Sequence, residues 1–224
     1  MNLNSIDYVV FDKMIKRGTA KILEDTDNAL FIYDTRSEGY YLACEDVNLG
    51  MNILDKYADR DIHLMMVTNM LIGEKAYEKY SFDGKYDCYQ FAYYGGNVDE
   101  DSCITTRTAT KEDIPFLLDN YDLISSEEIT KLVSIGNIEL AYAGSDLVGF
   151  MGEHLEGSMG LLYILPEHRR NGYASALEKH LIKINLDKGF VPYGHVVKDN
   201  IASIELQKRL GFTQSKELIR WMWK

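Results

Sequence analysis

Residues 161–174 read LLYILPEHRRNGYA, an apolar strand-like run that passes through a polar turn into the start of a helix. Gly172 and Ala174 are small, so they leave the backbone N–H groups of the first helical turn open. Arg169 and Arg170 add positive charge beside these groups, and the helix dipole attracts anions to the same place. The stretch predicts an anion cradle suited to a pyrophosphate. Taken alone, an arginine-rich turn before a helix is more often a solvated cap.

Strand and helix signals alternate around this stretch, through the second half of the chain. A capping-box pattern at 110–113 predicts a helix to about residue 120, and Ser125 opens another. Two strand-like runs flank the turn residues 144–146, which predicts a hairpin. The downstream pattern favours a strand at 159–165, a helix at 172–188, a strand at 191–197, a helix at 200–210 and a strand at 218–223.

The first half repeats part of this order. Its patterns favour strands at 29–34, 40–44, 62–68 and 86–94, and helices at 49–57 and 71–80. The alternative interpretation is that the two halves are unrelated α/β segments whose strands and helices are separated by ordinary turns. Between the halves, residues 95–102 read GGNVDEDS, which is typical of an exposed linker.

Composition limits the partners and the compartment. The 224 residues carry 24 Lys and Arg against 35 Asp and Glu, a net charge of −11, so we expect no nucleic-acid partner. The apolar runs are too short to span a bilayer, and residues 1–10 do not read as a secretory signal, so we expect no membrane partner and a cytoplasmic location. Three cysteines without a CxxC pair indicate neither a disulfide framework nor a zinc site, and we expect reduced, semi-buried thiols.

The pattern Arg169-x-x-Gly172-x-Ala174 after an apolar strand and a proline resembles the CoA-pyrophosphate loop of the GNAT superfamily of acyl-CoA N-acyltransferases. Further along, residues 200–212 read NIASIELQKRLGF, which is similar to that superfamily's second motif. The resemblance covers roughly residues 104–224. It implies an α+β fold with a GNAT-type central mixed sheet flanked by helices. The LPEHR segment and the stretch from Tyr193 to His195 also resemble, more weakly, the glycine N-acyltransferase-like branch.

This resemblance suggests two domains. Residues 103–224 would form the GNAT acyltransferase domain, and residues 1–102 a degenerate GNAT-like domain. The turn of the first half that corresponds to the loop contains Glu45 and Asp46 but no arginine, so it would repel a pyrophosphate. We expect this half to lack CoA binding and to contribute one wall of the acceptor pocket.

The resemblance also implies which residues hold acetyl-CoA as a co-substrate. The backbone around Tyr163 to Leu165 would pair with the pantetheine amides, and the amides from Arg170 to Ala174 would hold the pyrophosphate. Asn200 and Ser203 would lie near the pantetheine arm. No metal is implied. The full expected set is Tyr163, Ile164, Leu165, Arg169, Arg170, Asn171, Gly172, Tyr173, Ala174, Asn200 and Ser203.

Acyl transfer to an amine also requires groups that move protons. A free alkyl amine has a pKa near 10, so a base must remove a proton. Many members of the superfamily use a Glu and a Tyr at positions that read Ser158 and Gln207 here. The catalytic candidates are therefore Glu156 and Ser158, with Glu153, His154 and His195 also within plausible reach. Each of these residues also has a non-catalytic interpretation. The glutamates would be exposed carboxylates near a turn, and the histidines would be strand residues with their hydrogen bonds already made.

The leading hypothesis is an N-acetyltransferase that moves an acetyl or other short acyl group from CoA to a primary amine of a small molecule or peptide in a ternary complex. One alternative is an acyl-CoA-binding protein with weak catalysis. Another is an O-acyl or longer-chain acyltransferase on the same scaffold. The sequence is compatible with a monomer or a homodimer.

Overall fold

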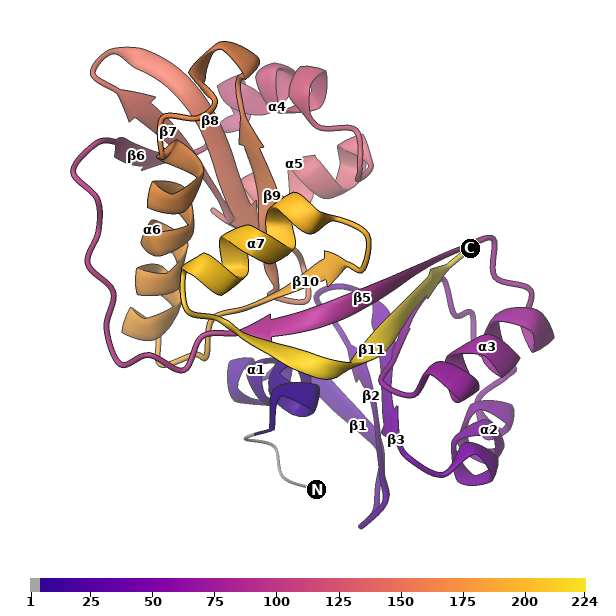
Figure 1. Ribbon diagram of the computed structural model, residues 1–224. Helices are drawn as coiled ribbons and strands as arrows, with labels where there is room; N and C mark the ends of the chain where they lie inside the picture. The colour runs from indigo at the N-terminus through magenta and orange to yellow at the C-terminus, as the bar shows by residue number, and fades with distance from the viewer. Residues whose placement is uncertain (1–4) are drawn as a thin grey trace. The chain divides into compact units, whose positions relative to one another are not determined.

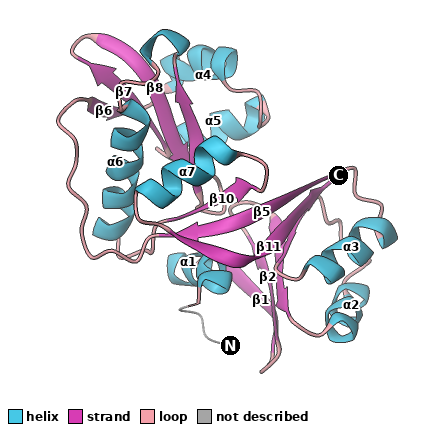
Figure 2. Ribbon diagram, viewed as in Figure 1, coloured by secondary structure: helices cyan, strands magenta, loops and turns pink. Residues whose placement is uncertain are grey.

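The structure is a computed structural model that describes residues 5–224. The described chain forms two compact units (Figure 1). One unit consists of the described residues up to Ala92 together with His195–Lys224, and the other is Tyr93–Gly194. Figure 2 distinguishes the helices from the strands of both units.

The first unit is a mixed sheet with helices on both faces. Its strand order is β1-β2-β3-β4-β11-β5. The N-terminal part supplies η1 (Ile6–Tyr8), α1 (Val9–Arg17), β1 (Ala20–Asp25), β2 (Ala29–Asp34), β3 (Gly39–Cys44), α2 (Val47–Lys56), β4 (Leu64–Val67), α3 (Met70–Lys79) and β5 (Gly84–Ala92). The C-terminal part adds α7 (Ile201–Arg209) and β11 (Thr213–Trp223). Strands β3 and β4 are parallel, whereas β11 is antiparallel to both of its neighbours, β4 and β5.

Strand β3 shows why this sheet needs helices on both faces. All six of its residues are buried. Tyr40 and Leu42 belong to the core that also contains Ile53 of α2 and Ile72 of α3. Tyr41 points to the other face, where its ring meets Phe11 of α1 edge-on at 6.5 Å. Burial on both faces accounts for the nearly continuous apolar sequence of β3.

The second unit is also a mixed sheet, with strand order β10-β9-β8-β7-β6. Its elements are β6 (Thr105–Thr108), η2 (Lys111–Asp113), α4 (Ile114–Asn120), α5 (Ser126–Ser134), β7 (Ile138–Ala143), β8 (Asp146–Glu153), β9 (Met159–Ile164), η3 (Pro166–His168) and α6 (Tyr173–Asp187). Strand β10 (Tyr193–Val197) begins in this unit and continues into the first. Helices α4 and α5 cover one face of the sheet, and α6 packs on β8 and β9 from the other (Figure 1).

The mixed α/β class with flanking helices is confirmed, and most of the expected elements are present. The structure adds helix α1, strands β1 and β6 and the short 3-10 helices η1 and η3, which the patterns did not predict. Strands β1 and β6 are largely exposed, so they lack the apolar alternation that identifies a strand. Among residues 5–224, no helix has both the length and the apolar character needed to cross a membrane.

The compact units do not coincide with the two expected domains. The C-terminal residues, including β11, lie with the first unit and not with the expected domain 103–224. The physical reason is strand pairing, because β11 hydrogen-bonds to β4 on one side and β5 on the other. Residues 1–4 of the expected first domain lie outside the described residues.

Candidate functional site

Strand β9 leads into the predicted anion cradle, and it contains a bulge. In the antiparallel pair with β8, Phe150 lies opposite Tyr163 and Gly152 lies opposite Gly160. Two residues of β9 therefore face a single residue of β8, which defines a β-bulge. One of the two, Leu161, has φ +54° and is 2% exposed. A buried leucine in this region of φ is strained, and such positions concentrate at functional sites.

Alternate backbone groups of β9 point away from β8, toward the edge on which β10 lies. The N–H of Leu165 donates to the carbonyl of Val148, so Leu165 points its backbone toward β8. Ile164, one residue earlier, points its backbone to the opposite edge because the direction alternates along a strand. Its carbonyl accepts from Arg169 Nε at 3.0 Å, which leaves the Ile164 N–H directed to that edge. The edge is the one at which pantetheine pairing is expected.

The turn after β9 leaves the start of α6 open. Arg170 and Gly172 both adopt left-handed backbone conformations, with φ +67° and φ +86°. Gly172 is the N-cap of α6, and a Cβ placed on it would meet no atom within 4 Å. No acidic residue lies in the first turn of this fifteen-residue helix. No side chain caps this N-terminus, so the first-turn N–H groups have no side-chain acceptor and no acidic residue of the first turn competes for them.

The corresponding helix of the first unit is closed in the same place. Helix α2 follows β3, as α6 follows β9, but its N-cap is Asp46. The carboxylate of Asp46 accepts from the N–H of Leu49 at 2.8 Å, so the chain supplies its own anion at this helix N-terminus. This contrast fits the expectation that only the second half holds a pyrophosphate.

The residues present at α6 fit the pyrophosphate of CoA. Arg169 and Arg170 are both exposed beside the open N-terminus. Arg169 is also held in place, since its guanidinium lies 5.8 Å from the centre of the Tyr163 ring and its Nε is bonded to the chain. Asn171 donates through Nδ2 to the carbonyl of His168 at 3.1 Å, which braces the turn. Two guanidiniums and open amides together suit a diphosphate.

The turn between β8 and β9 gathers the carboxylate candidates. Glu153, Glu156 and Ser158 are 8%, 7% and 2% exposed. The Ser158 hydroxyl donates to Glu156 Oε1, and the Tyr193 hydroxyl donates to the Glu156 carbonyl at 3.1 Å. The side chain of Glu156 is therefore fixed close to β9, and Ser158 orients it.

His154 joins this cluster from the end of β8. Its Nδ1 lies 3.8 Å from Glu128 Oε1 near the start of α5. A Cβ on Gly160 would lie 2.6 Å from His154 Nε2, so the imidazole lies directly over Gly160 of β9. Burial alone would lower the pKa of His154, but the contact with Glu128 and the charges of Glu156 and Glu128 raise it above the ordinary value.

His195 has a different environment, in the first unit. The indole N–H of Trp221 donates to His195 Nδ1 at 3.3 Å. Because an indole can only donate, Nδ1 is the acceptor and Nε2 carries the proton, which faces Gln90 Oε1 at 3.3 Å. With both ring nitrogens engaged, His195 is less available than His154 as a proton acceptor.

The remaining predicted residues also lie in the first unit. Asn200 is the N-cap of α7, and its side-chain oxygen accepts from the N–H of Ser203 at 3.2 Å. Gln207 is a buried residue of the same helix. The interaction of Asn200 and Ser203 with pantetheine stays a prediction. The predicted residues from 153 to 174, in contrast, are all held within one compact unit.

Glu128 and Gly160 were missed at the sequence level. The available signal for Gly160 was an isolated glycine within a strand pattern, which indicates a close approach by another group. Glu128 was visible only as part of a helix-capping pattern. Nothing in the spacing of 128 and 154 shows that these residues meet.

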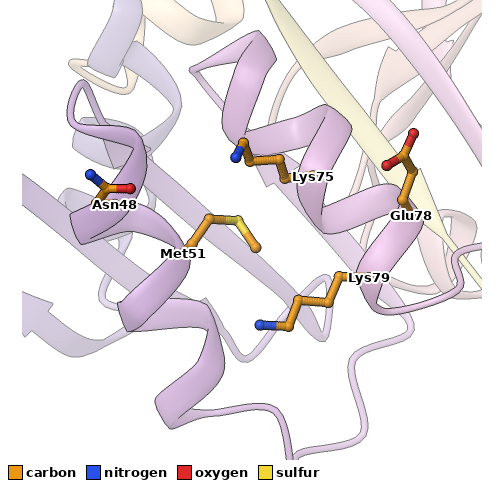
Figure 3. A pocket seen from close by; sticks show the side chains of 5 residues that line it. All are labelled: Asn48, Met51, Lys75, Glu78 and Lys79. Atoms are coloured by element: carbon orange, nitrogen blue, oxygen red, sulfur yellow. The ribbon is translucent and has the colours of Figure 1, made fainter.

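A shallow hollow on the first unit lies away from all these residues. It is formed by α2 and α3 and lined by Asn48, Met51, Lys75, Glu78 and Lys79 (Figure 3). Lys79 is already paired with Asp55 at 2.5 Å. The hollow contains none of the predicted site residues. Among residues 5–224, no group of three or more His, Cys, Asp or Glu side chains is placed to hold a metal ion.

Comparisons with known proteins address the sequence family and the fold. Residues 142–222, which include β8, β9, the turn and α6, match the model of the FR47-like protein family. No curated protein sequence matches the chain.

Solved structures match along nearly the whole chain. A protein from Drosophila melanogaster is 13% identical, with a TM-score of 0.67, and the match covers 100% of this chain and 91% of that one. A candidate acetyltransferase of the GNAT family from Novosphingobium aromaticivorans is 16% identical, with a TM-score of 0.57 and coverages of 97% and 96%. A GCN5-related N-acetyltransferase-like protein from Streptococcus suis is 14% identical, with a TM-score of 0.55 and coverages of 96% and 92%.

These matches confirm the GNAT-type fold that the resemblance implied. The chain has the fold of the GNAT superfamily, and residues 142–222 carry the sequence pattern of the FR47-like family. The comparisons do not bear on the glycine N-acyltransferase-like branch, which stays a prediction.

Proposed function

We propose that this protein is an N-acetyltransferase that transfers an acetyl or other short acyl group from CoA to a primary amine of a small molecule or peptide. The observation that carries the proposal is the N-terminus of α6, where Gly172 is the N-cap and no side chain caps the first-turn amides beside Arg169 and Arg170. The bulged strand β9 leads directly into this turn, and its edge away from β8 offers the Ile164 N–H to the pantetheine arm.

In this proposal one group of residues binds CoA and another group transfers protons. Amides from Arg170 to Ala174 and the two guanidiniums hold the pyrophosphate. CoA supplies the activated acyl group as a thioester. The buried cluster around Glu156 and Ser158 lies at the start of β9, at the opposite end of the strand from the Arg169–Gly172 turn. In this proposal the acceptor amine lies near the cluster and needs a base there.

The partner is proposed to be a cationic small amine and not a nucleic acid, since the chain carries a net charge of −11. Such long-range charge is screened by salt beyond about 10 Å, so it supports the class of partner and not its identity.

We also propose a cytoplasmic location. The three free cysteines support this location. Their burial differs from the semi-buried state that we expected for all three, because Cys44 and Cys88 are buried and Cys103 is exposed.

The test combines binding with turnover. Titration calorimetry with CoA and acetyl-CoA should show one site, and acetyl-CoA mixed with a panel of primary amines should release free thiol with at least one of them. Tight acetyl-CoA binding without release would favour the alternative of a weakly catalytic acyl-CoA-binding protein, to which Ser158 and Gln207 also point. Absence of CoA binding would contradict the proposal.

A further inference from the structure

The imidazole of His154, at the β8–β9 turn, lies next to the carboxylate of Glu128 on α5. We propose that His154, with Glu128 behind it, is the base that removes the proton from the acceptor amine. This inference rests on the proposed acyl transfer and names the residue that makes the amine reactive.

The first observation is the orientation of the imidazole. Nδ1 faces the Glu128 carboxylate at 3.8 Å, and Nε2 faces Gly160 on β9. Within residues 5–224, Nε2 makes no hydrogen bond. A carboxylate behind one ring nitrogen and an unengaged second nitrogen is the arrangement that general-base histidines require.

The second observation is the absence of a side chain at Gly160. Its φ lies outside the left-handed region, so the backbone there does not demand glycine. The constraint is the ring of His154, because a Cβ would lie 2.6 Å from Nε2. Gly160 thus lets the imidazole lie directly on the strand expected to bind the acyl arm.

The third observation is the distance along β9. Gly160 and Ile164 lie opposite Gly152 and Gly149 of β8, which are three residues apart, so at about 3.3 Å per residue the bulged segment spans roughly 10 Å. An extended acyl arm that starts from a pyrophosphate at the turn and pairs with β9 would run along this segment toward Gly160. The base therefore lies at the end of β9 at which the thioester is expected.

Glu156 has a supporting role in this arrangement. Its carboxylate already accepts from Ser158 and is fixed at the turn, which makes it a source of negative charge near His154. The charged groups that face the imidazole are Glu128 from α5 and Glu156 from the turn. Both stabilise the imidazolium that forms when Nε2 takes a proton.

The step balances without any further reactant. Nε2 takes one proton from the ammonium group, and the freed nitrogen lone pair forms a bond to the thioester carbon. The carbon–sulfur bond breaks, sulfur leaves as a thiolate, and the thiolate takes the second proton lost by nitrogen. The imidazolium then returns its proton to solvent.

The experiment uses the full chain and an amine that the wild-type protein acetylates. His154→Asn should lower kcat by about 100-fold or more with little change in the KM for acetyl-CoA. The deficit should shrink as the pH approaches the amine pKa near 10, and it should be smaller for a weakly basic amine, because neither case needs a base. His63→Asn, at an exposed histidine paired with Asp61, is the matched control and should keep wild-type rates.

A second readout does not depend on turnover. NMR titration of the unliganded protein should give His154 a pKa above the ordinary histidine value, and Glu128→Gln should lower that pKa because it removes the carboxylate beside Nδ1. The rising limb of the kcat/KM profile should move to lower pH by the same amount. Gly160→Ala, which displaces the ring, should lower kcat, whereas Gly96→Ala, where no atom lies within 4 Å of the new Cβ, should not.

The outcomes separate the two proposals. Wild-type kcat and pH profile in both His154→Asn and Gly160→Ala would overturn the role of His154 and leave the acyltransfer proposal standing. Loss of activity in Glu156→Gln with retention in His154→Asn would do the same and assign the base to Glu156. Failure of the wild-type protein to release thiol with any amine would overturn both proposals.

Discussion

At the scale of single residues, the comparison of Gly172 with Asp46 explains why one helix start is open and the other closed. Each is the N-cap of a helix that follows a strand in a parallel pair. Asp46 fills its helix N-terminus with a carboxylate, whereas Gly172 has no side chain and adopts φ +86°. The choice of one residue thus decides whether an external anion has access to the amides.

Gly172→Glu should therefore weaken CoA binding. The new carboxylate would lie beside the amides that are to hold the pyrophosphate, and the like charge should cost about 1.4–2 kcal/mol, a 10- to 30-fold rise in Kd. Titration calorimetry with CoA measures the change.

Gly189→Glu is the matched control, since Gly189 follows the C-terminal end of the same helix, has φ +76°, and also has no atom within 4 Å of a Cβ. Both variants should lose stability by about 1–2 kcal/mol because both force a side chain into the left-handed region. Equal CoA affinity in the two variants would contradict the assignment of the turn.

At the scale of elements, the start of α4 shows how much a short sequence pattern can predict. The expected capping box is present, with Thr110 and Asp113 exchanging side-chain and backbone hydrogen bonds. The pattern did not reveal the partner of Asp113, which is Arg107 on β6, bonded through both nitrogens at 2.7 Å. Strand β6 was itself not predicted, so the local sequence pattern could not show that Arg107 pairs with Asp113.

This ion pair predicts a pH dependence of stability. The Arg107 guanidinium lowers the pKa of Asp113 to about 2, against an ordinary value of 3.8. A carboxyl whose pKa is lower in the folded state stabilises the fold above its unfolded pKa, and this contribution disappears as the pH falls from about 4 to 2. Asp113→Asn should lower the free energy of unfolding at pH 7 by about 1–2 kcal/mol, after allowance for the exposure of Arg107.

Urea denaturation at pH 7, 5, 4 and 3 provides the measurement, and the difference from the wild-type protein should narrow at the acidic end. Asp119→Asn, at an exposed residue of the same helix, should change stability by less than about 0.5 kcal/mol. A constant difference between Asp113→Asn and wild type across this range would contradict the assigned ion pair.

At the scale of the whole molecule, β11 decides how the chain divides. The sequence shows a composition change and a linker near residue 100, and these features predict two consecutive domains. The C-terminal strand instead pairs with β4 along Arg220–Trp223 and with β5 along its length. The pairing is reinforced by Arg220, which bonds to Asp87 at 2.7 Å and also to Glu74.

A fragment of residues 1–102 should consequently fail to fold alone. It contains β4 and β5 but lacks the strand that lies between them, so two edges would be left unpaired. Its circular dichroism and urea denaturation should show no cooperative transition. The same fragment joined through a flexible linker to residues 212–224 should recover one, and cooperative unfolding of the unmodified fragment would contradict the role of β11.

Taken by itself, the sequence determined the features that depend on neighbours along the chain. The strand, turn and helix around Arg169 to Ala174 follow from local hydrophobic patterning, a proline and a glycine, and on these features alone we predict a CoA site there. The acidic turn at Glu45 and Asp46 likewise predicts that the first half does not bind a pyrophosphate.

Only the tertiary structure decided which distant residues meet. His154, Gly160 and Glu128 come together because a hairpin folds β8 onto β9 and α5 packs on the same face, and no local pattern encodes that meeting. Strand β11 joins the first unit for the same reason. Pairing between strands far apart in sequence depends on which edges remain free once the sheet has formed, and local propensity does not determine those edges.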